Sequence, residues 1–185
     1  MAIRILTLNG SVRVPSRTSI LLTALRDAIG PYVDAEFDAV HLAQDGLAIL
    51  TALNRESLSK EGVRLIERVE TADLLLVGTP VYRASYTGVL KHLFDLVRRP
   101  ALSGKAAVLV ASGGSPLHSL VIEHQLRPLL AFFNVHTAPT GIYASDADFG
   151  EGALANAAIT ERIARAAKEA AHLLSVTRGV QLRSP

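Results

Sequence analysis

Hydroxyl and guanidinium side chains are concentrated in one segment near the N-terminus, NGSVRVPSRTS at residues 9–19. Serine hydroxyls and the forked donors of arginine are suited to binding phosphate oxygens. A helical pattern follows directly, so the free N–H groups and the positive end of that helix would point to the same place. The side chains concerned are Ser11, Arg13, Ser16, Arg17, Thr18 and Ser19. This composition favours a phosphate site over an ordinary serine-rich helix cap, although the segment is neither a P-loop nor a G-x-G-x-x-G fingerprint.

Two further segments carry residues suited to a flat ligand. The sequence GTPVYRASYTG at residues 78–88 combines a stiffening proline with tyrosines, and such a loop can enclose a planar ring. The sequence SGGSP at residues 112–116 contains Gly113 and Gly114, which let the backbone approach a ligand closely. Taken singly, the tyrosines could instead pack on a sheet edge, and the glycines could form a plain turn. The segments indicate one site only if the fold brings them together.

The elements that would position these segments follow from hydrophobic periodicity. Short apolar runs predict strands at residues 3–8, 33–42, 73–79, 106–112 and 135–143. Apolar residues at helical spacing predict helices over 16–29, 56–71, 87–97, 117–133 and 152–174, and residues 43–55 are predicted to be a loop.

The alternation of strands and helices predicts an α/β fold, in which helices cover both faces of a parallel sheet. Five strands in 185 residues fit a flavodoxin-like doubly wound five-stranded sheet with strand order 2-1-3-4-5. Ligands bind beyond the carboxyl ends of the strands in this topology. The three segments are therefore expected to form one crevice, with a phosphate end and a ring end. We expect a single domain over residues 1–177 and a polar tail over 178–185.

The composition excludes several classes of function. The chain has no cysteine, which rules out disulfides, cysteine-ligated zinc, iron–sulfur clusters and a thiol nucleophile. A formal charge of only +2, with 5% aromatic residues and no tryptophan, predicts no nucleic-acid partner. The N-terminus lacks the features of a signal peptide, and no apolar run is long enough to cross a membrane. We expect a cytoplasmic protein without a membrane partner.

No group of side chains has the spacing of a catalytic or metal-binding motif. The histidines do not occur in H-x-H or H-E-x-x-H patterns, and there is no G-x-S-x-G elbow. We therefore expect no metal and no catalytic residue in the chain.

Together, the sequences GSVRVPSRTSILL and GTPVYRASYTGVLKHLFDLV and the SGG turn resemble the NAD(P)H-dependent FMN reductase family. They are most similar to the reductase components of two-component alkanesulfonate and methanesulfonate monooxygenases. The resemblance runs from Ile3 to about Tyr143. It implies that the FMN phosphate is held by Ser11, Arg13, Ser16 and Ser19, with Arg17 near it. It implies that the ribityl chain and ring contact Pro80, Val81, Tyr82 and Arg83, and that the pyrimidine side contacts Ser112, Gly113 and Gly114.

The resemblance also implies a reaction and partners. NADPH or NADH would transfer hydride to FMN, and the reduced FMN would pass to a flavin-dependent monooxygenase that desulfonates sulfonates. Family members are usually homodimers or homotetramers, with the helix after Gly88 at the subunit contact. Arg83, Arg98 and Arg99 are the candidates for meeting the 2′-phosphate of NADPH. The residues equally allow an FMN-retaining quinone, azo-dye or chromate reductase, and a flavodoxin-type electron carrier remains a further alternative.

His124 is a point of departure from the resemblance. In alkanesulfonate-type reductases the matching segment carries a tyrosine near the flavin at the subunit contact, and this tyrosine is linked to a π-bulge. The sequence IEHQLRP places His124 there, which is closer to the methanesulfonate type. We expect His124 to lie near the flavin or at a subunit interface.

Overall fold

The central strands are apolar on both faces, and this requires a layer of helices on each side of the sheet. The computed structural model describes residues 2–179 and 183. Along β3 (Leu74–Pro80), Leu75 and Val77 pack into one core and Leu74 and Leu76 into the other. The same alternation holds along β1 (Ile3–Asn9) and β4 (Ala106–Gly113).

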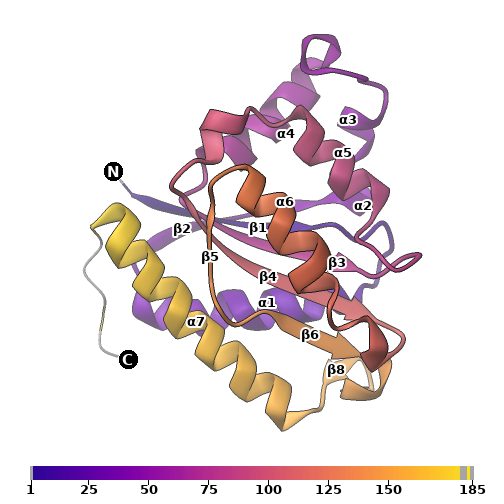
Figure 1. Ribbon diagram of the computed structural model, residues 1–185, viewed down its shortest axis with the longest axis vertical. Coiled ribbons are helices and arrows are strands. Elements are labelled where there is room, and N and C mark those ends of the chain that lie inside the picture. The colour runs from indigo at the N-terminus through magenta and orange to yellow at the C-terminus, as the bar shows by residue number, and fades with distance from the viewer. Residues whose placement is uncertain (1, 180–182, 184–185) are drawn as a thin grey trace.

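Five helices form the two outer layers (Figure 1). One face of the sheet is covered by α1 (Arg17–Ile29) and the long α7 (Ala157–Arg178). The other face is covered by α4 (Lys60–Thr71), α5 (Gly88–Leu96) and α6 (Arg127–Phe132). The predicted helices over 16–29, 56–71 and 87–97 are confirmed, with ends shifted by a few residues.

The sheet is parallel, with strand order β2-β1-β3-β4-β5, and it includes β2 (Ala35–His41) at one edge. The predicted α/β flavodoxin-like architecture is confirmed. The predicted number of strands is wrong, because the fifth strand is divided into β5 (His136–Thr137) and β6 (Ile142–Ser145), which both pair with β4. Side chains hold the chain between them: Glu169 accepts hydrogen bonds from the N–H and hydroxyl of Thr140. Pro139 has no N–H to donate to a ladder.

Three other predicted boundaries are corrected. The predicted loop 43–55 contains α2 (Leu42–Asp45) and α3 (Leu47–Leu50). The predicted helix 117–133 is replaced by the 3-10 turn Pro116–His118, the π-helix Ile122–Leu126 and then α6. Residues 152–156 form no helix, since a small hairpin of β7 (Phe149–Gly150) and β8 (Ala153–Leu154) precedes α7. Further 3-10 turns cover Gly30–Tyr32, Arg55–Ser57, Arg99–Leu102 and Asp146–Asp148.

The π-helix has a local cause in the sequence. Pro128 stands at the start of α6 and donates no N–H to the preceding turn, which favours a change of hydrogen-bond register there. Glu123 and Arg127 pair across the turn at 2.6 Å, and Arg127 also donates to the carbonyl oxygens of Ala138 and Pro139. The π-helix is thereby tied to the chain between β5 and β6.

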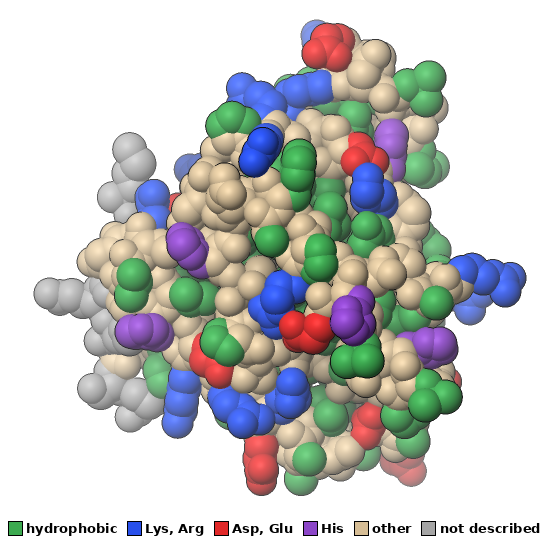
Figure 2. Space-filling view, in the orientation of Figure 1, with side chains coloured by type: hydrophobic (Ala, Val, Ile, Leu, Met, Phe, Trp, Pro, Cys, Tyr) green, Lys and Arg blue, Asp and Glu red, His purple; other side chains and the backbone are tan. Residues whose placement is uncertain are grey.

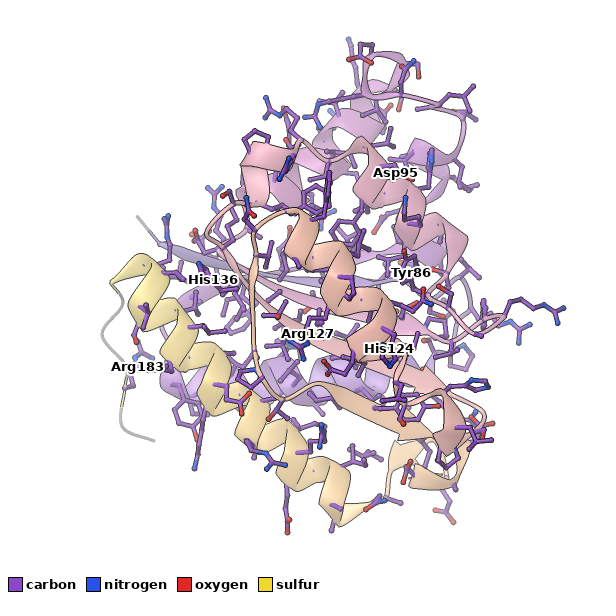
Figure 3. All side chains as sticks on the ribbon, in the orientation of Figure 1. Tyr86, Asp95, His124, Arg127, His136 and Arg183 are labelled. Atoms are coloured by element: carbon purple, nitrogen blue, oxygen red, sulfur yellow. The ribbon has the colours of Figure 1, made fainter. Side chains whose placement is uncertain are left out.

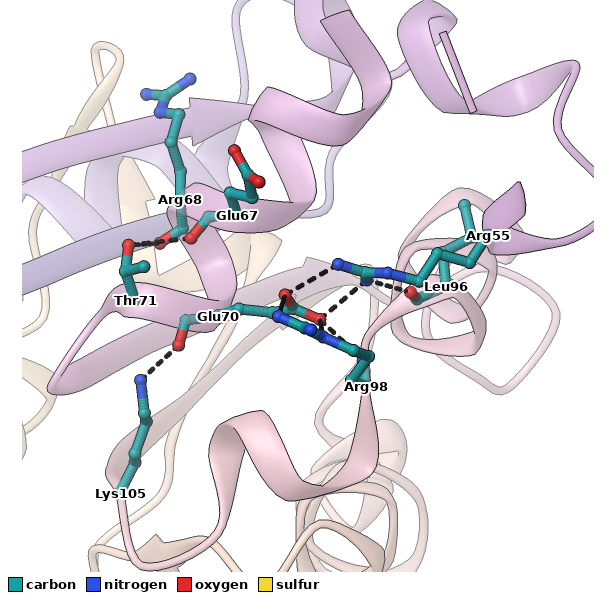
Figure 4. Close-up of polar contacts among 8 residues, drawn as sticks. All are labelled: Arg55, Glu67, Arg68, Glu70, Thr71, Leu96, Arg98 and Lys105. Carbon is teal, nitrogen blue, oxygen red and sulfur yellow. Dashed lines mark hydrogen bonds and ion pairs between the residues drawn. The ribbon is translucent and has the colours of Figure 1, made fainter. Parts of the chain in front are cut away.

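A buried carboxylate links the elements at the amino-terminal edge of the sheet (Figure 4). The Glu70 side chain is 3% exposed and accepts from the guanidinium groups of Arg55 and Arg98 at 2.8 and 3.0 Å. Lys105 donates to the carbonyl oxygens of Glu70 and Ala72. Burial alone would raise the pKa of Glu70, but the donors from Arg98 and Arg55 outweigh it, and the pKa lies below its usual value.

The end of the chain is only partly described. Arg178 is the last residue of α7 and pairs with Asp73 at 3.1 Å. Most of the predicted tail 178–185 lies outside the described residues, and the predicted domain 1–177 stays a prediction. Among the described residues, none of the helices combines the length and the apolar character needed to cross a bilayer.

Candidate functional site

The segments singled out in the sequence meet at the carboxyl edge of the sheet. A cavity of about 550 Å³ opens there, beyond the ends of β1, β3 and β4. It is lined by Ser11, Arg13, Pro15, Ser16, Arg17, Thr18, Ile20, Pro80, Val81, Tyr82, Ser112, Gly113, Gly114, Asp146 and Gly152. Its volume is within the range of cofactor and ligand pockets.

The loop after β1 is held by its own backbone and by β3. The N–H of Gly10 donates to the carbonyl oxygen of Gly78 at 2.7 Å, and Thr87 donates to the carbonyl oxygen of Gly10 at 2.7 Å. A Cβ at position 10 would lie 2.9 Å from that Gly78 oxygen, so only glycine permits this approach. Asn9 accepts from the N–H of Ser11 at 3.0 Å, which turns Ser11 toward the cavity wall.

The amino end of α1 faces the cavity. Ser16 is the N-cap and its hydroxyl accepts from the N–H of Ser19. The first N–H groups of the helix, at Arg17 and Thr18, have no partner within the helix because of their position. Ser19 itself does not line this cavity and instead faces a neighbouring one of about 370 Å³.

The loop after β3 forms the apolar wall. The N–H of Val81 donates to the carbonyl oxygen of Ser112 at 2.7 Å and so fixes this loop to the next one. Tyr82 and Ser85 bond to each other through a tight turn in which Arg83 and Ala84 have φ of 51° and 65°. This turn leaves Arg83 exposed, and Arg83 is absent from the cavity lining. The Arg13 guanidinium lies 5.8 Å from the centre of the Tyr82 ring.

The loop after β4 closes the opposite wall and requires a glycine. A Cβ at Gly113 would lie 2.6 Å from the Tyr143 hydroxyl and 3.4 Å from Val81 Cβ. The Tyr143 hydroxyl donates to the carbonyl oxygen of Ser115, which holds the loop in place. Burial raises the pKa of Tyr143, and the carboxylates of Asp146 and Asp148 raise it further. Ser112 and Thr18 hydroxyls bond at 2.7 Å beneath the cavity floor.

Two lining residues come from a segment for which the sequence predicts no site residue. Asp146 and Gly152 follow β6 and border the same cavity as the serine-rich loop. Asp146 pairs with Arg17 at 2.6 Å. The sequence signal that points to them is position, because they follow the carboxyl end of the last strand, where ligands bind in this topology.

Comparisons with known proteins identify the family. The family model for NADPH-dependent FMN reductase matches residues 3–150. The chain belongs to the NADPH-dependent FMN reductase family. The chain is 47% identical over 164 residues to the NADH-dependent FMN reductase SfnF of Pseudomonas putida, with 88% of each covered. It is 39% identical to an FMN reductase (NADPH) of Pseudomonas aeruginosa, over 92% of this chain and 91% of that one.

A solved structure agrees with these matches. The apo form of the NADH:FMN oxidoreductase EMOB superposes with a TM-score of 0.83 at 27% identity, over 98% of this chain and 95% of that one. The resemblance inferred from the sequence motifs is confirmed. The protein is an NAD(P)H-dependent FMN reductase, an oxidoreductase that uses FMN with a pyridine nucleotide.

The cavity of this FMN reductase fits the chemistry of FMN. One end offers hydroxyls, guanidinium groups and the open end of α1, which suit a phosphate dianion. The other end offers Val81 and Tyr82 as apolar surface, with the backbone of Gly113 and Gly114 beside them. Among the described residues, no three His, Asp or Glu side chains are grouped to hold a metal ion.

Several residues that the sequence suggests for binding the flavin or the nucleotide lie away from the cavity. His124 is exposed within the π-helix, as Figure 3 shows, and it is absent from the lining. The neighbouring Gln125 accepts from Ser85, so the π-helix contacts the loop after β3. Arg98 binds Glu70, and Arg99 donates to the Phe132 carbonyl.

On the face drawn in Figure 2, acidic and basic side chains are interspersed.

Proposed function

We propose that the cavity binds FMN with its phosphate at the amino end of α1. Ser11, Arg13, Ser16 and Arg17 line that end, and the N–H groups of the first helical turn complete the donor set. Ser19 contributes indirectly, because its N–H is the donor that orients the Ser16 hydroxyl. The coincidence of this donor set with an apolar, glycine-walled end in one cavity is the observation that carries the proposal.

The ring of FMN would lie between the two remaining loops. Pro80, Val81 and Tyr82 supply one wall, and Ser112, Gly113 and Gly114 supply the other. The hydrogen bond from Val81 N–H to the Ser112 carbonyl holds the two walls at a fixed separation. Backbone N–H groups of the glycine loop are suited to the polar edge of a flavin, since no side chain blocks their approach.

The chain's part in the reaction is to bind and orient the reactants. Bound FMN supplies the hydride acceptor for the nicotinamide of NADH or NADPH. The Thr18–Ser112 hydroxyl pair and the Tyr143–Ser115 bond hold the floor and the wall of the cavity in place. A rigid wall matters because hydride transfer depends on the distance and alignment of the two rings. The reaction calls for no proton transfer from a side chain.

The proposed role is to supply reduced FMN to a flavin-dependent monooxygenase that acts on sulfonates. The resemblance of the motifs to the reductases of such two-component systems supports this role. The exposed Gly114 and the half-exposed Arg17 leave the cavity open to solvent, which favours exchange of the flavin.

His124 and the π-helix, next to the loop after β3, are proposed to lie at a subunit contact in a homodimer or homotetramer.

Dialysis followed by steady-state kinetics tests this role. The dialysed protein is expected to be colourless, to oxidise NADH or NADPH only when FMN is added, and to use riboflavin far less well. Protein that stays yellow and reduces a quinone without added FMN would instead be a flavin-retaining reductase. Protein that binds FMN and oxidises neither nucleotide would be an electron carrier.

A further inference from the structure

The positive groups at the phosphate end have different partners. Arg13 lies against the Tyr82 ring and is paired with no carboxylate among the described residues. Arg17 is paired with Asp146 at 2.6 Å and lies 5.6 Å from the centre of the Phe149 ring. Both partners of Arg17 come from the segment after β6. The guanidinium is therefore turned toward that segment, while Arg17 and Asp146 both border the cavity.

The segment that carries Asp146 is fixed in place. Asp148 accepts hydrogen bonds from the N–H and the hydroxyl of Ser145 at 2.7 and 2.8 Å, and it also accepts from Asn156. The hydrogen bond from Asn156, with those from Ser145, lowers the pKa of Asp148, so it remains a charged acceptor. Asp146 is therefore held at the rim of the cavity by its neighbours, and its own carboxylate is left to pair with Arg17.

A carboxylate in this place opposes the binding of a phosphate. It has the same sign of charge as the ligand, and it occupies the guanidinium that the ligand would use. The Arg17 and Asp146 side chains are 50% and 53% exposed, so the pair is weak enough to open when another anion arrives. The cost of opening it is subtracted from the affinity for the phosphate.

We propose that Asp146 competes with the flavin phosphate for Arg17 and thereby sets how readily FMN leaves the site. The proposal rests on the proposed function, because it assumes that the cavity end next to α1 receives the phosphate. Asp146 acts as a specificity-determining residue: it weakens the phosphate-dependent part of flavin binding and leaves the ring-dependent part unchanged. This suits a reductase whose reduced flavin must pass to another protein.

The test compares the dissociation constants of FMN and riboflavin by flavin fluorescence for the wild type and for Asp146→Asn. FMN is expected to bind the variant roughly 1.5-fold to fivefold more tightly, the range that an exposed ion pair spans. Riboflavin binding is expected to stay the same, because riboflavin has no phosphate. The matched control is Glu151→Gln, which removes the same charge from an exposed residue of the same segment outside the cavity lining and is expected to leave both constants unchanged.

A second background separates competition for Arg17 from simple repulsion. With Arg17→Gln already present, adding Asp146→Asn is expected to produce little further gain in FMN affinity. The proposal is overturned if Asp146→Asn does not tighten FMN, if riboflavin tightens equally, or if the full gain persists without Arg17. Thermal unfolding of each variant, in the same buffer, shows that the comparison is made between folded proteins.

The same measurements distinguish the two proposals. If wild-type protein binds FMN and riboflavin equally, the phosphate site at α1 is wrong and the proposed function loses its support. If wild-type protein prefers FMN and only the Asp146 variant fails to respond, the phosphate site stands and the competition by Asp146 is rejected.

Discussion

Arginine side chains have different partners at the two ends of the parallel strands, here called the amino-terminal and the carboxyl edge of the sheet. At the amino-terminal edge, Arg55 and Arg98 are both bound to the buried Glu70. At the carboxyl edge, Arg13 faces an aromatic ring and Arg17 has one half-exposed carboxylate partner. The first arrangement uses its donors within the protein and ties α4 and α5 together. The second keeps its donors available at a cavity, so the same residue type stabilises the fold at one edge and can bind a ligand at the other.

The largest effect is expected from breaking the amino-terminal cluster. Glu70→Gln leaves two partly exposed arginines without their shared charge, and a loss of about 2 kcal/mol in the free energy of unfolding is expected, as for lost hydrogen bonds to a charged group. Urea unfolding measures this loss. Glu67→Gln, on the exposed face of the same helix, should change stability little. Folded Glu70→Gln protein should bind FMN with the wild-type affinity. A parallel loss of FMN affinity would contradict the claim that the amino-terminal cluster acts on stability and not on the ligand site.

The next effect concerns the wall of the cavity. Gly113→Ala places a Cβ 2.6 Å from the Tyr143 hydroxyl, so the Tyr143 side chain must shift and its hydrogen bond to Ser115, in the loop after β4, is disturbed. FMN binding is expected to weaken about tenfold, an overpacking cost of the usual size. Gly88→Ala is the control, since nothing lies within 4 Å of a Cβ there. Equal FMN affinity in the Gly113 variant and the wild type would show that this loop does not contact the flavin.

A smaller effect distinguishes the two arginines of the site. Arg13→Gln is expected to weaken FMN binding by roughly fivefold to tenfold, in line with a hydrogen bond of ordinary strength, because the Arg13 side chain is exposed to water. Arg17→Gln is expected to cost less, because Asp146 already opposes its use by the ligand. Titrations with FMN and riboflavin measure both. A larger loss at Arg17 than at Arg13 would reverse the ranking that the ion pair implies.

The smallest effect is a dependence of stability on acid. A hydrogen bond from Arg68 lowers the pKa of Asp38, and one from Arg127 lowers the pKa of Glu123. The pKa of Glu70 is also lowered, because hydrogen bonds from arginine outweigh the effect of burial. Groups with a lowered pKa stabilise the fold above their unfolded pKa, and this stability is lost as pH falls through the folded pKa. Unfolding midpoints measured from about pH 6 down to about pH 3 should therefore decrease. Glu70→Gln should flatten this decrease, and an unchanged slope would show that Glu70 contributes none of it.

The central part of the fold was predictable because its residues repeat a simple pattern. The strands that became β1, β3 and β4 are short apolar runs ended by turn residues, and the serine and glycine segments follow them directly. Parallel topology then places the three segments at one edge. The fifth strand was not predictable in detail, because its division depends on contacts of Glu169 and Arg127 with distant carbonyl and N–H groups.

The sequence by itself determined the residue types of the site, the layered parallel fold and the family, since each depends on local spacing and on short motifs. The tertiary structure decided which of those residues face the cavity. In the folded chain the Ser19 side chain faces a neighbouring cavity, and Arg83 lies on a tight turn that keeps it out of the flavin cavity. Asp146, which is distant from Arg17 in the sequence, pairs with it. The direction of a side chain and the partner of a charge depend on packing between distant segments, which local sequence does not encode.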